Sequence, residues 1–404
     1  MSSALPKRSV YAAPAALVGS IEYARRLVEE LGVDCFIVRT GFHPSEHDAS
    51  LARAVEQVRA FGIGCWLLVG TWWGHGFEPG EEAMVGVADD LIAGGYRGHE
   101  SQWRMASPGG RTDDAIEASL RHLCEQLGPD AVLLTHARYR HAAAIGGLFE
   151  VGGESFRSLM HERGLSQRDL RHAVKLVIGA LVNMDPVELA GHARDRGLAQ
   201  FLDSLSGTDV FSRWFDLRAE LVTRSITRFR SAVKSVRPDA RFGTNAVGPV
   251  GAFESGQSYA ALVEQCDVIQ PLLGYVYWHV WQTVSAWQQF LSDRVQSISS
   301  GAAWSVAAAL FGLTGVDIDP EWRSEVSDTT APPHLIDGVV RRQLALLEEQ
   351  RDRRRLFTPV LNAGHWPAAT VRDLTAVVDT SGYPGVAYQG TASLVHPVTG
   401  DGWN

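Results

Sequence analysis

The sequence is poor in cysteine, which limits what disulfides and thiolate-bound metals can contribute to the structure. Its 404 residues include four cysteines, each in or beside an apolar run: Cys35, Cys65, Cys124 and Cys266. No two of them stand at metal-ligand spacing, so we expect four reduced thiols in the core.

Long hydrophobic runs and excess basic charge are also missing. The N-terminal stretch MSSALPKRSVYAAPAALVG has no long apolar segment after its basic residues, which predicts no signal peptide and no membrane span and favours a cytoplasmic protein. A formal net charge of −9 argues against a nucleic acid or an anionic membrane as the main partner. Neither a Walker motif nor G-x-G-x-x-G follows a predicted strand, and we expect no cofactor. No feature of the sequence specifies an oligomeric state.

Short apolar runs alternate with longer helical patterns along the chain. Eight of the runs read as strands: SVYAA (9–13), DCFIVRT (34–40), CWLLVGT (65–71), AVLLTHA (131–137), RFGTNAV (241–247), DVIQPLLGY (267–275), LFTPVLNA (356–363) and GVAYQGT (385–391). Eight strands separated by helices predict an α/β fold, a single (β/α)8 TIM barrel domain over 1–404.

Long, mostly helical insertions are expected in this barrel after the fourth and sixth strands, at about 142–210 and 276–333. Within the second, the apolar stretch at 300–312 is compatible with either a strand or a helix. A doubly wound open sheet is the alternative fold, but it would normally carry a phosphate loop.

Neutral hydrogen-bonding residues end most of the predicted strands, and aromatic residues and histidines follow directly. In a TIM barrel these strand ends line the active site. Amides and hydroxyls can bind sugar hydroxyls, and flat rings can cover the apolar face of a pyranose. The predicted carbohydrate-binding residues are Trp72, Trp73, His136, Arg138, Tyr139, Asn245, Gln270, Tyr275, Trp278, Asn362, His365 and Trp366.

Three phrases of the chain carry a family resemblance: DAVLLTHARYRH, WFDLRAELVTRSITRFRSAVKSVRPDARFGTNAV and LVEQCDVIQPLLGY. With them the segment of about 95–275 resembles the poorly characterised glycoside-hydrolase-like TIM barrels. The resemblance implies a barrel that acts on glycans. The positions that match the family pattern are Arg138, Tyr139, Trp214 and Arg218.

The chain departs from that family at the end of the fourth strand, where Thr135 replaces an aspartate. Glycoside hydrolysis normally needs two carboxyl groups across the scissile bond. The acids would then come from loops, and the best placed are Glu150, in the apolar setting GGLFEVGG, and Glu254, after the strand that carries Asn245. An apolar setting raises a carboxyl pKa, as an acid catalyst requires.

Two other functions fit the same residues. Loss of the strand-end acid is typical of a barrel that only binds a carbohydrate. A metal-dependent hydrolase could instead use His43 and His47 with His75, His136 or His365, although Pro44 disfavours a regular helix at His43 and we predict no metal. Asp216 and Arg218, two positions apart on one helix, are interpreted as an ion pair.

Overall fold

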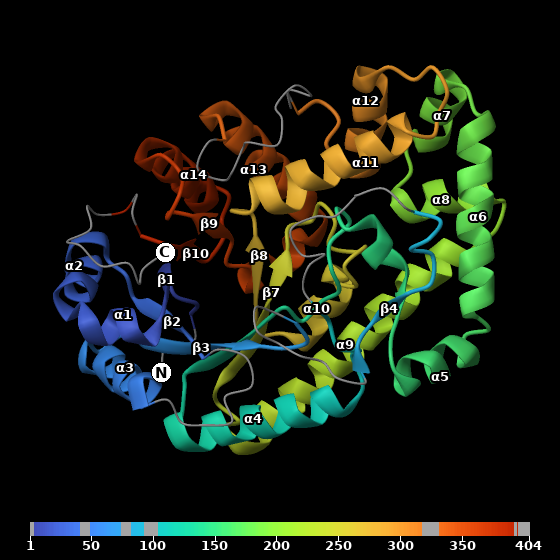
Figure 1. Ribbon diagram of the computed structural model, residues 1–404. Coiled ribbons are helices and arrows are strands. Elements are labelled where there is room, and N and C mark those ends of the chain that lie inside the picture. Colours follow the sequence, from blue (N-terminus) through green and yellow to red (C-terminus); the bar gives the residue numbers. More distant parts are fainter. Residues whose placement is uncertain are drawn as a thin grey trace.

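A computed structural model of the chain describes residues 4–40, 49–73, 82–92, 104–316, 331–391 and 394. Its centre is a sheet of eight parallel strands in the order β8-β7-β5-β3-β2-β1-β10-β9 (Figure 1). These strands are β1 (Arg8–Ala12), β2 (Cys35–Arg39), β3 (Gly64–Gly70), β5 (Ala131–Thr135), β7 (Arg241–Val247), β8 (Val268–Leu272), β9 (Val360–Asn362) and β10 (Val386–Gln389).

The two outer strands of this order meet and nearly close the barrel. Ile269 forms a parallel bridge with Phe357, and the Thr358 amide donates to the Ile269 carbonyl at 2.9 Å. The Gly274 amide donates to the Val360 carbonyl at 2.8 Å. The predicted (β/α)8 TIM barrel is therefore confirmed, and its carboxyl strand ends form one mouth.

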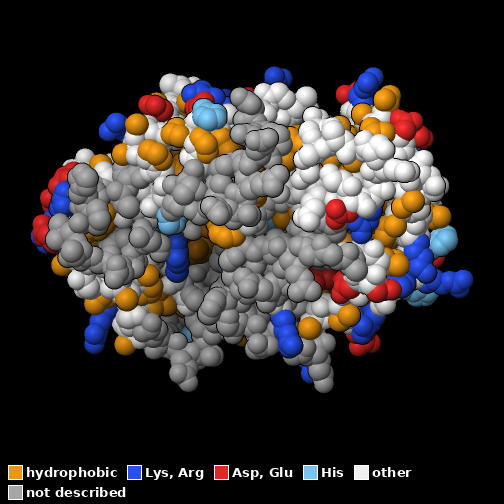
Figure 2. Space-filling model, turned by 45° about the horizontal axis from the view of Figure 1, so that its top comes forward, with side chains coloured by type: hydrophobic (Ala, Val, Ile, Leu, Met, Phe, Trp, Pro, Cys, Tyr) orange, Lys and Arg blue, Asp and Glu red, His pale blue; other side chains and the backbone are white. Residues whose placement is uncertain are grey.

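Helices surround the barrel between successive strands. They are α1 (Pro14–Gly19), α2 (Ile21–Leu31), α3 (Ala49–Ala60), α4 (Arg111–Leu127), α9 (Val210–Val236), α10 (Tyr259–Gln265), α13 (Pro333–Leu347), the 3-10 segment η5 (Glu348–Leu356) and α14 (Ala368–Thr380). Figure 2 shows charges of both signs over α2 at the left edge, where Arg26 pairs with Glu30 at 2.8 Å. Such a mixed surface is typical of a solvated helix face.

Two groups of additional helices follow β5 and β8. The first holds η3 (Ile145–Phe149), α5 (Glu154–Glu162), α6 (Gln167–Asn183), α7 (Pro186–Ala193) and α8 (Leu198–Ser206), and the second η4 (Val276–Trp281), α11 (Gln282–Ser292) and α12 (Ser300–Leu310). The ambiguous stretch at 300–312 is thus helical, because Ser299 caps it by accepting from the Ala302 amide. α12 packs against α7, so the two groups lie together at the right of Figure 1.

A small two-stranded sheet was not expected from the sequence. β4 (Val85–Gly86) pairs antiparallel with β6 (Glu150–Val151), and this joins the loop after β3 to the loop after β5. Two-residue strands are too short to leave a period-2 pattern in the sequence. The pairing fixes the surroundings of Glu150.

The core has two parts, one inside the barrel and one between the sheet and the helices. Tyr11, Ile37, Leu68, Leu133 and Leu272 belong to the inner cluster, because alternate strand residues face the barrel axis. All four cysteines are buried and free, as predicted. Among the described residues, no helix is both long and apolar enough to cross a bilayer.

Candidate functional site at the barrel mouth

A polar triad crosses the barrel interior below the mouth. The Tyr11 hydroxyl lies 2.9 Å from Asn245 Oδ1 and 2.5 Å from Gln270 Oε1. A phenol has one proton, so it donates to one amide while the other must turn its NH2 toward the phenol oxygen. Gln270 is fully buried and its Nε2 has no hydrogen-bond partner within the described chain. The triad therefore forms a rigid polar floor with unused hydrogen-bonding capacity.

Half-exposed groups stand above this floor. Burial raises the pKa of Tyr11 well above that of a free phenol, with a further rise from nearby Tyr275 and an opposing effect of Arg39. Arg39 and Tyr275 therefore lie close to the triad, and both are half-buried. Tyr275 also stacks on His279 at a centroid distance of 4.8 Å, and His279 lies 5.1 Å from His141.

The described groups at the mouth that remain accessible are few and mostly neutral. Because their side chains are half-exposed, they can touch a ligand without rearrangement. They are Arg39, Thr135, His136, Tyr275, Trp278 and Gln389, together with the more exposed His365. This set offers hydrogen bonds, flat rings and one cation, which suits a polyol.

Arg39 and Tyr11 were missed in the sequence because both lie within apolar runs. Arg39 is the last residue of β2, and its inward position follows from the alternation along Cys35–Arg39. A charged residue that ends a buried strand was the signal that could have identified it. Thr40, the predicted strand end, instead caps the strand by donating to the Leu68 carbonyl.

Three of the tryptophans predicted to bind carbohydrate are enclosed by protein. Trp72, Trp73 and Trp366 are at most 1% exposed, so in this structure their rings offer no face to a ligand. Trp72 Nε1 donates to Asp113 Oδ1 at 2.6 Å, and Trp73 Nε1 donates to the Arg138 carbonyl at 2.9 Å. Through these hydrogen bonds, Trp72 and Trp73 stabilise the loops that follow β3 and β5.

The predicted ligand-positioning pair Arg138 and Tyr139 is also buried. The Arg138 guanidinium lies 4.5 Å from the centre of the Trp73 ring. Tyr139 lies under Arg218, whose guanidinium carbon is 4.2 Å from the phenol ring, a cation–π contact. Both residues therefore support the mouth from below.

The predicted ion pair between Asp216 and Arg218 is wrong. Residues two apart on a helix point in different directions, so Asp216 is exposed whereas Arg218 is fully buried. Arg218 Nη1 instead donates to the Leu148 carbonyl at 2.7 Å. Burial lowers the pKa of Arg218 to about 10.

His136 occupies a strained position at the end of β5. Its φ is 59°, a left-handed conformation that is uncommon for residues other than glycine. Its ring packs on Trp73 at 4.5 Å. Across the mouth, Asn362 Oδ1 accepts from the amide of His365 at 3.2 Å, and the side chain of His365 is exposed. Backbone strain of this kind is frequent at functional sites.

The two predicted acids, Glu150 and Glu254, share a buried cation. Glu150 forms an ion pair with Arg140 Nη1, whereas Glu254 is 8% exposed and makes no ion pair within the described part of the chain. Burial raises the pKa of both carboxyls, while Arg140 opposes this for Glu150 and Arg218 opposes it for both. The carboxyls therefore flank the region around Arg218, and Glu254 is the one held without a direct cationic partner among the described residues.

Asp113 is a third buried acid, but its hydrogen bonds commit it to structure. It accepts from Trp72 Nε1, from Ser225 Oγ at 2.5 Å and from the Gly109 amide at 2.9 Å. A carboxylate with three donors is satisfied. It ties the start of α4 to α9 and to the loop after β3.

Glu254→Gln is expected to change the pH dependence of stability. Because the folded pKa of Glu254 is raised, the folded chain binds this proton more tightly than the unfolded chain. The resulting stabilisation is complete below the unfolded pKa and is lost as the pH rises through the folded pKa. The variant should therefore gain melting temperature over the wild type at pH 8, and gain less at pH 4.5. Glu29→Gln, at an exposed position, is the control. An equal gain in melting temperature for Glu254→Gln at both pH values would contradict the burial argument.

The metal-dependent alternative rests on residues outside the described ranges. His43, His47 and His75 all fall there. Within the described residues, no group of three or more His, Cys, Asp or Glu side chains is arranged to hold a metal ion.

Two solved structures of carbohydrate-active domains share this fold. The PgaB (BpsB) glycoside hydrolase domain from Bordetella bronchiseptica has a TM-score of 0.56 and 12% identity, over 95% of this chain and 93% of that chain. The catalytic domain of β-amylase from Paenibacillus polymyxa has a TM-score of 0.52 and 12% identity, over 97% of this chain and 94% of that chain. No protein-family model and no curated protein sequence matches the chain. At this identity the likeness shows a common fold.

Proposed function

We propose that the chain is a glycoside-hydrolase-like enzyme that acts on an oligosaccharide or glycoconjugate at the barrel mouth. The observation that carries the proposal is the set of partly exposed residues at the barrel mouth, above the floor formed by Tyr11, Asn245 and Gln270. Its hydroxyl, amide and aromatic groups fit a sugar better than an apolar or strongly charged ligand. The two solved carbohydrate-active domains of the same fold support the same class of substrate.

Glu254 is proposed as the group that protonates the leaving oxygen, and Glu150 as the second carboxyl. A general acid must hold its proton near neutral pH, which the raised pKa of Glu254 favours. Glu150, paired with Arg140, is better held as a carboxylate. Arg39 and Tyr275 would position the sugar, Arg39 by hydrogen bonds and Tyr275 by stacking.

A second function is favoured by one specific observation. Apart from β2, which ends at Arg39, the barrel strands of the described chain end in neutral residues such as Thr135, Asn362 and Gln389, and none ends in an acid. A barrel without a strand-end acid fits a protein that recognises a carbohydrate without cleaving it. Binding and turnover must therefore be measured separately.

The proposal is tested by incubating the chain with neutral and acidic oligosaccharides and measuring new reducing ends alongside binding by calorimetry. Release of reducing ends supports the enzyme, whereas binding without release supports the alternative. Failure to bind any member of the panel contradicts both.

Arg39→Ala is expected to weaken binding of the sugar that responds by about tenfold or more, because a hydrogen bond from a charged group is worth about 1.5–3 kcal/mol. Arg53→Ala is the matched control, since Arg53 is exposed on α3. Equal affinities of the two variants would place the ligand away from this mouth.

A further inference from the structure

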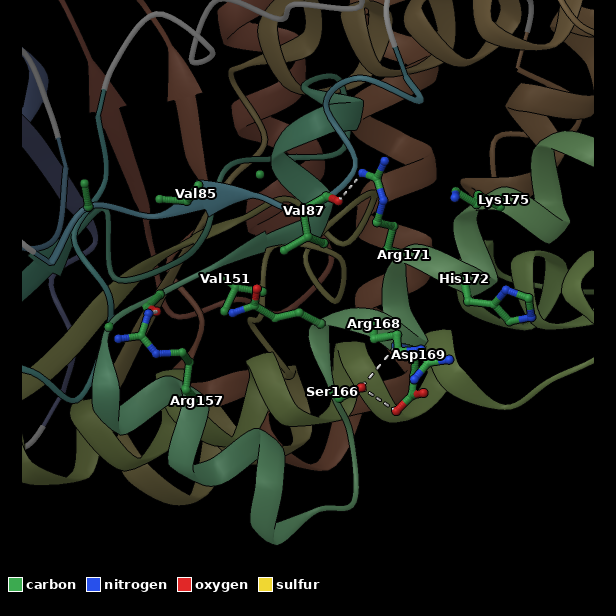
Figure 3. A pocket seen from close by; sticks show the side chains of 15 residues that line it. Val85, Val87, Val151, Arg157, Ser166, Arg168, Asp169, Arg171, His172 and Lys175 are labelled. Carbon is green, nitrogen blue, oxygen red and sulfur yellow. Dashed lines mark hydrogen bonds between the residues drawn. The ribbon is translucent and has the colours of Figure 1, made fainter.

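A separate cavity lies beside the small two-stranded sheet. β4 and β6 form one wall, and α5 and α6 form the other (Figure 3). Its volume is about 980 Å³, at the upper end of the range for small-molecule sites. Neither Glu254 nor any of the partly exposed residues at the barrel mouth contributes to its lining.

The two walls differ in chemistry. Val85, Val87 and Val151 make the strand wall apolar, and Val85 is 64% exposed. The helix wall is basic, with Arg157 on α5 and further cations and a histidine along α6. Four cations line the cavity, against the single carboxylate of Asp169. This excess occurs in a chain whose net charge is −9.

Part of this positive charge is not neutralised by the protein. Arg171 is paired, since its two terminal nitrogens each lie 2.6 Å from an oxygen of Asp90. Within the described residues, Arg168 and Lys175 make no hydrogen bond or ion pair, and Lys175 acts on the charge of Asp90 only at longer range. Arg157 makes a single bond of 3.3 Å to the Gly152 carbonyl.

The single acid in the cavity belongs to the N-terminal cap of α6. Asp169 Oδ2 accepts from Ser166 Oγ at 2.7 Å, and the Asp169 amide donates to the same hydroxyl at 3.1 Å, as drawn in Figure 3. This arrangement caps α6. Within the described residues, Asp169 makes no ion pair with Arg168 or Lys175.

Helix stability does not explain the arrangement on α6. Arg171 lies three positions after Arg168, and Lys175 lies four after Arg171, so the three cations share one face. Cations at this spacing repel one another and destabilise a helix. Figure 2 shows several Lys, Arg and His side chains at the right edge of the molecule, on the side where α6 lies in Figure 1.

We propose that this cavity binds the carboxylate or sulfate groups of an acidic glycan. Arg157, Arg168 and Lys175 would contact the anionic groups, since guanidinium matches planar oxyanions in two-point hydrogen bonds. The valine wall would cover the apolar face of a sugar ring. That the anion is carried by a saccharide rests on the proposed function.

The cavity also adjoins one of the proposed catalytic acids. Val151 lines it, and the preceding residue in β6 is Glu150, which turns to Arg140. An acidic glycan in the cavity would therefore lie across β6 from that ion pair. The cavity would select chains by charge, while the barrel mouth handles the bond to be cut.

The test is calorimetric titration with three probes: a hexamer of galacturonic acid, a heparin-derived hexasaccharide and neutral maltohexaose. We expect the acidic probes to bind the wild-type chain, and Arg168→Gln/Lys175→Gln to weaken them at least about tenfold. Affinity should also fall as salt is raised, because the contacts are partly exposed. The site is supported if either acidic probe binds the wild type and binds the double variant more weakly. Which of the two probes binds distinguishes carboxylate from sulfate recognition.

The double variant Lys7→Gln/Arg53→Gln is the control. It removes the same charge from two exposed positions, one directly before β1 and one on α3. The inference is overturned if no acidic probe binds, or if the two double variants bind them equally. Both titrations are repeated in Glu254→Gln, so that turnover cannot affect the result. Absence of turnover with intact acidic binding would defeat the proposed function alone, whereas turnover without acidic binding would defeat this inference alone.

Discussion

Glu254→Gln is expected to lower kcat for glycan hydrolysis by about 10²- to 10⁴-fold, the usual contribution of a positioned general acid. The amide has nearly the shape of the acid but cannot deliver a proton to the leaving oxygen. Substrate affinity should change little, because Glu254 is almost completely buried and the accessible hydrogen-bonding groups lie elsewhere in the mouth. The measurement is kcat and KM on the best oligosaccharide of the panel.

The pH dependence of activity distinguishes a general acid from a residue that only stabilises the structure. In the wild type, activity should fall at high pH as Glu254 loses its proton, and burial displaces this limb upward from an ordinary carboxyl. In Glu254→Gln that limb should disappear from the residual activity.

Glu150→Gln and Glu29→Gln complete this experiment. Glu150→Gln should also reduce kcat, but it removes the buried negative charge that pairs with Arg140, so a loss of stability should accompany the loss of activity. Glu29→Gln, at an exposed position of α2, should change neither. If both Glu254→Gln and Glu150→Gln keep the wild-type kcat, the catalytic carboxyl groups belong to other residues.

Arg218→Ala is expected to destabilise the chain by about 3–5 kcal/mol, as for other buried charged groups whose partners are left behind. Arg218 is fully buried, donates to the Leu148 carbonyl and covers the ring of Tyr139. Its removal also takes away the cation that lies near both Glu150 and Glu254. Urea unfolding monitored by tryptophan fluorescence measures the change.

Arg224→Ala is the matched control on the same helix. Arg224 pairs with Glu220 at 2.5 Å, but its side chain is 57% exposed, so its loss should cost at most about 1 kcal/mol. Arg218→Met should lie between the two, because it keeps most of the volume and loses the charge. Equal free energies of unfolding for Arg218→Ala and Arg224→Ala would show that Arg218 is not a structural centre.

The barrel was predictable because its signals are local. A strand covered on both faces is a continuous apolar run, as in Cys35–Arg39 and Ala131–Thr135, and the helices between strands keep a 3.6-residue period. The predicted strand boundaries differ from the observed ones by one to three residues at most ends, where caps and turns decide the length. β4 and β6 have no comparable signal, since each is two residues long and depends on its partner.

The polar and aromatic character of the barrel mouth was predictable from the sequence, but which residues are accessible there was not. The sequence identifies aromatic and hydrogen-bonding residues near strand ends, yet it does not say which of them face solvent. Trp72 and Trp366 are enclosed, whereas Arg39 and Tyr275 are accessible. Exposure depends on which loops fold over which, and one residue of register along a strand exchanges the inward and outward sides.

The sequence by itself determined the fold class, the buried thiols and the shortage of acids at the strand ends, because composition and periodicity act over a few neighbouring residues. The tertiary structure decided the pairing of Glu150 with Arg140 and the burial of Arg218. It also created the basic cavity by placing α5 and α6 opposite β4 and β6. These features join residues from separate parts of the chain, and burial, charge pairing and cavity shape arise only when those parts are packed together.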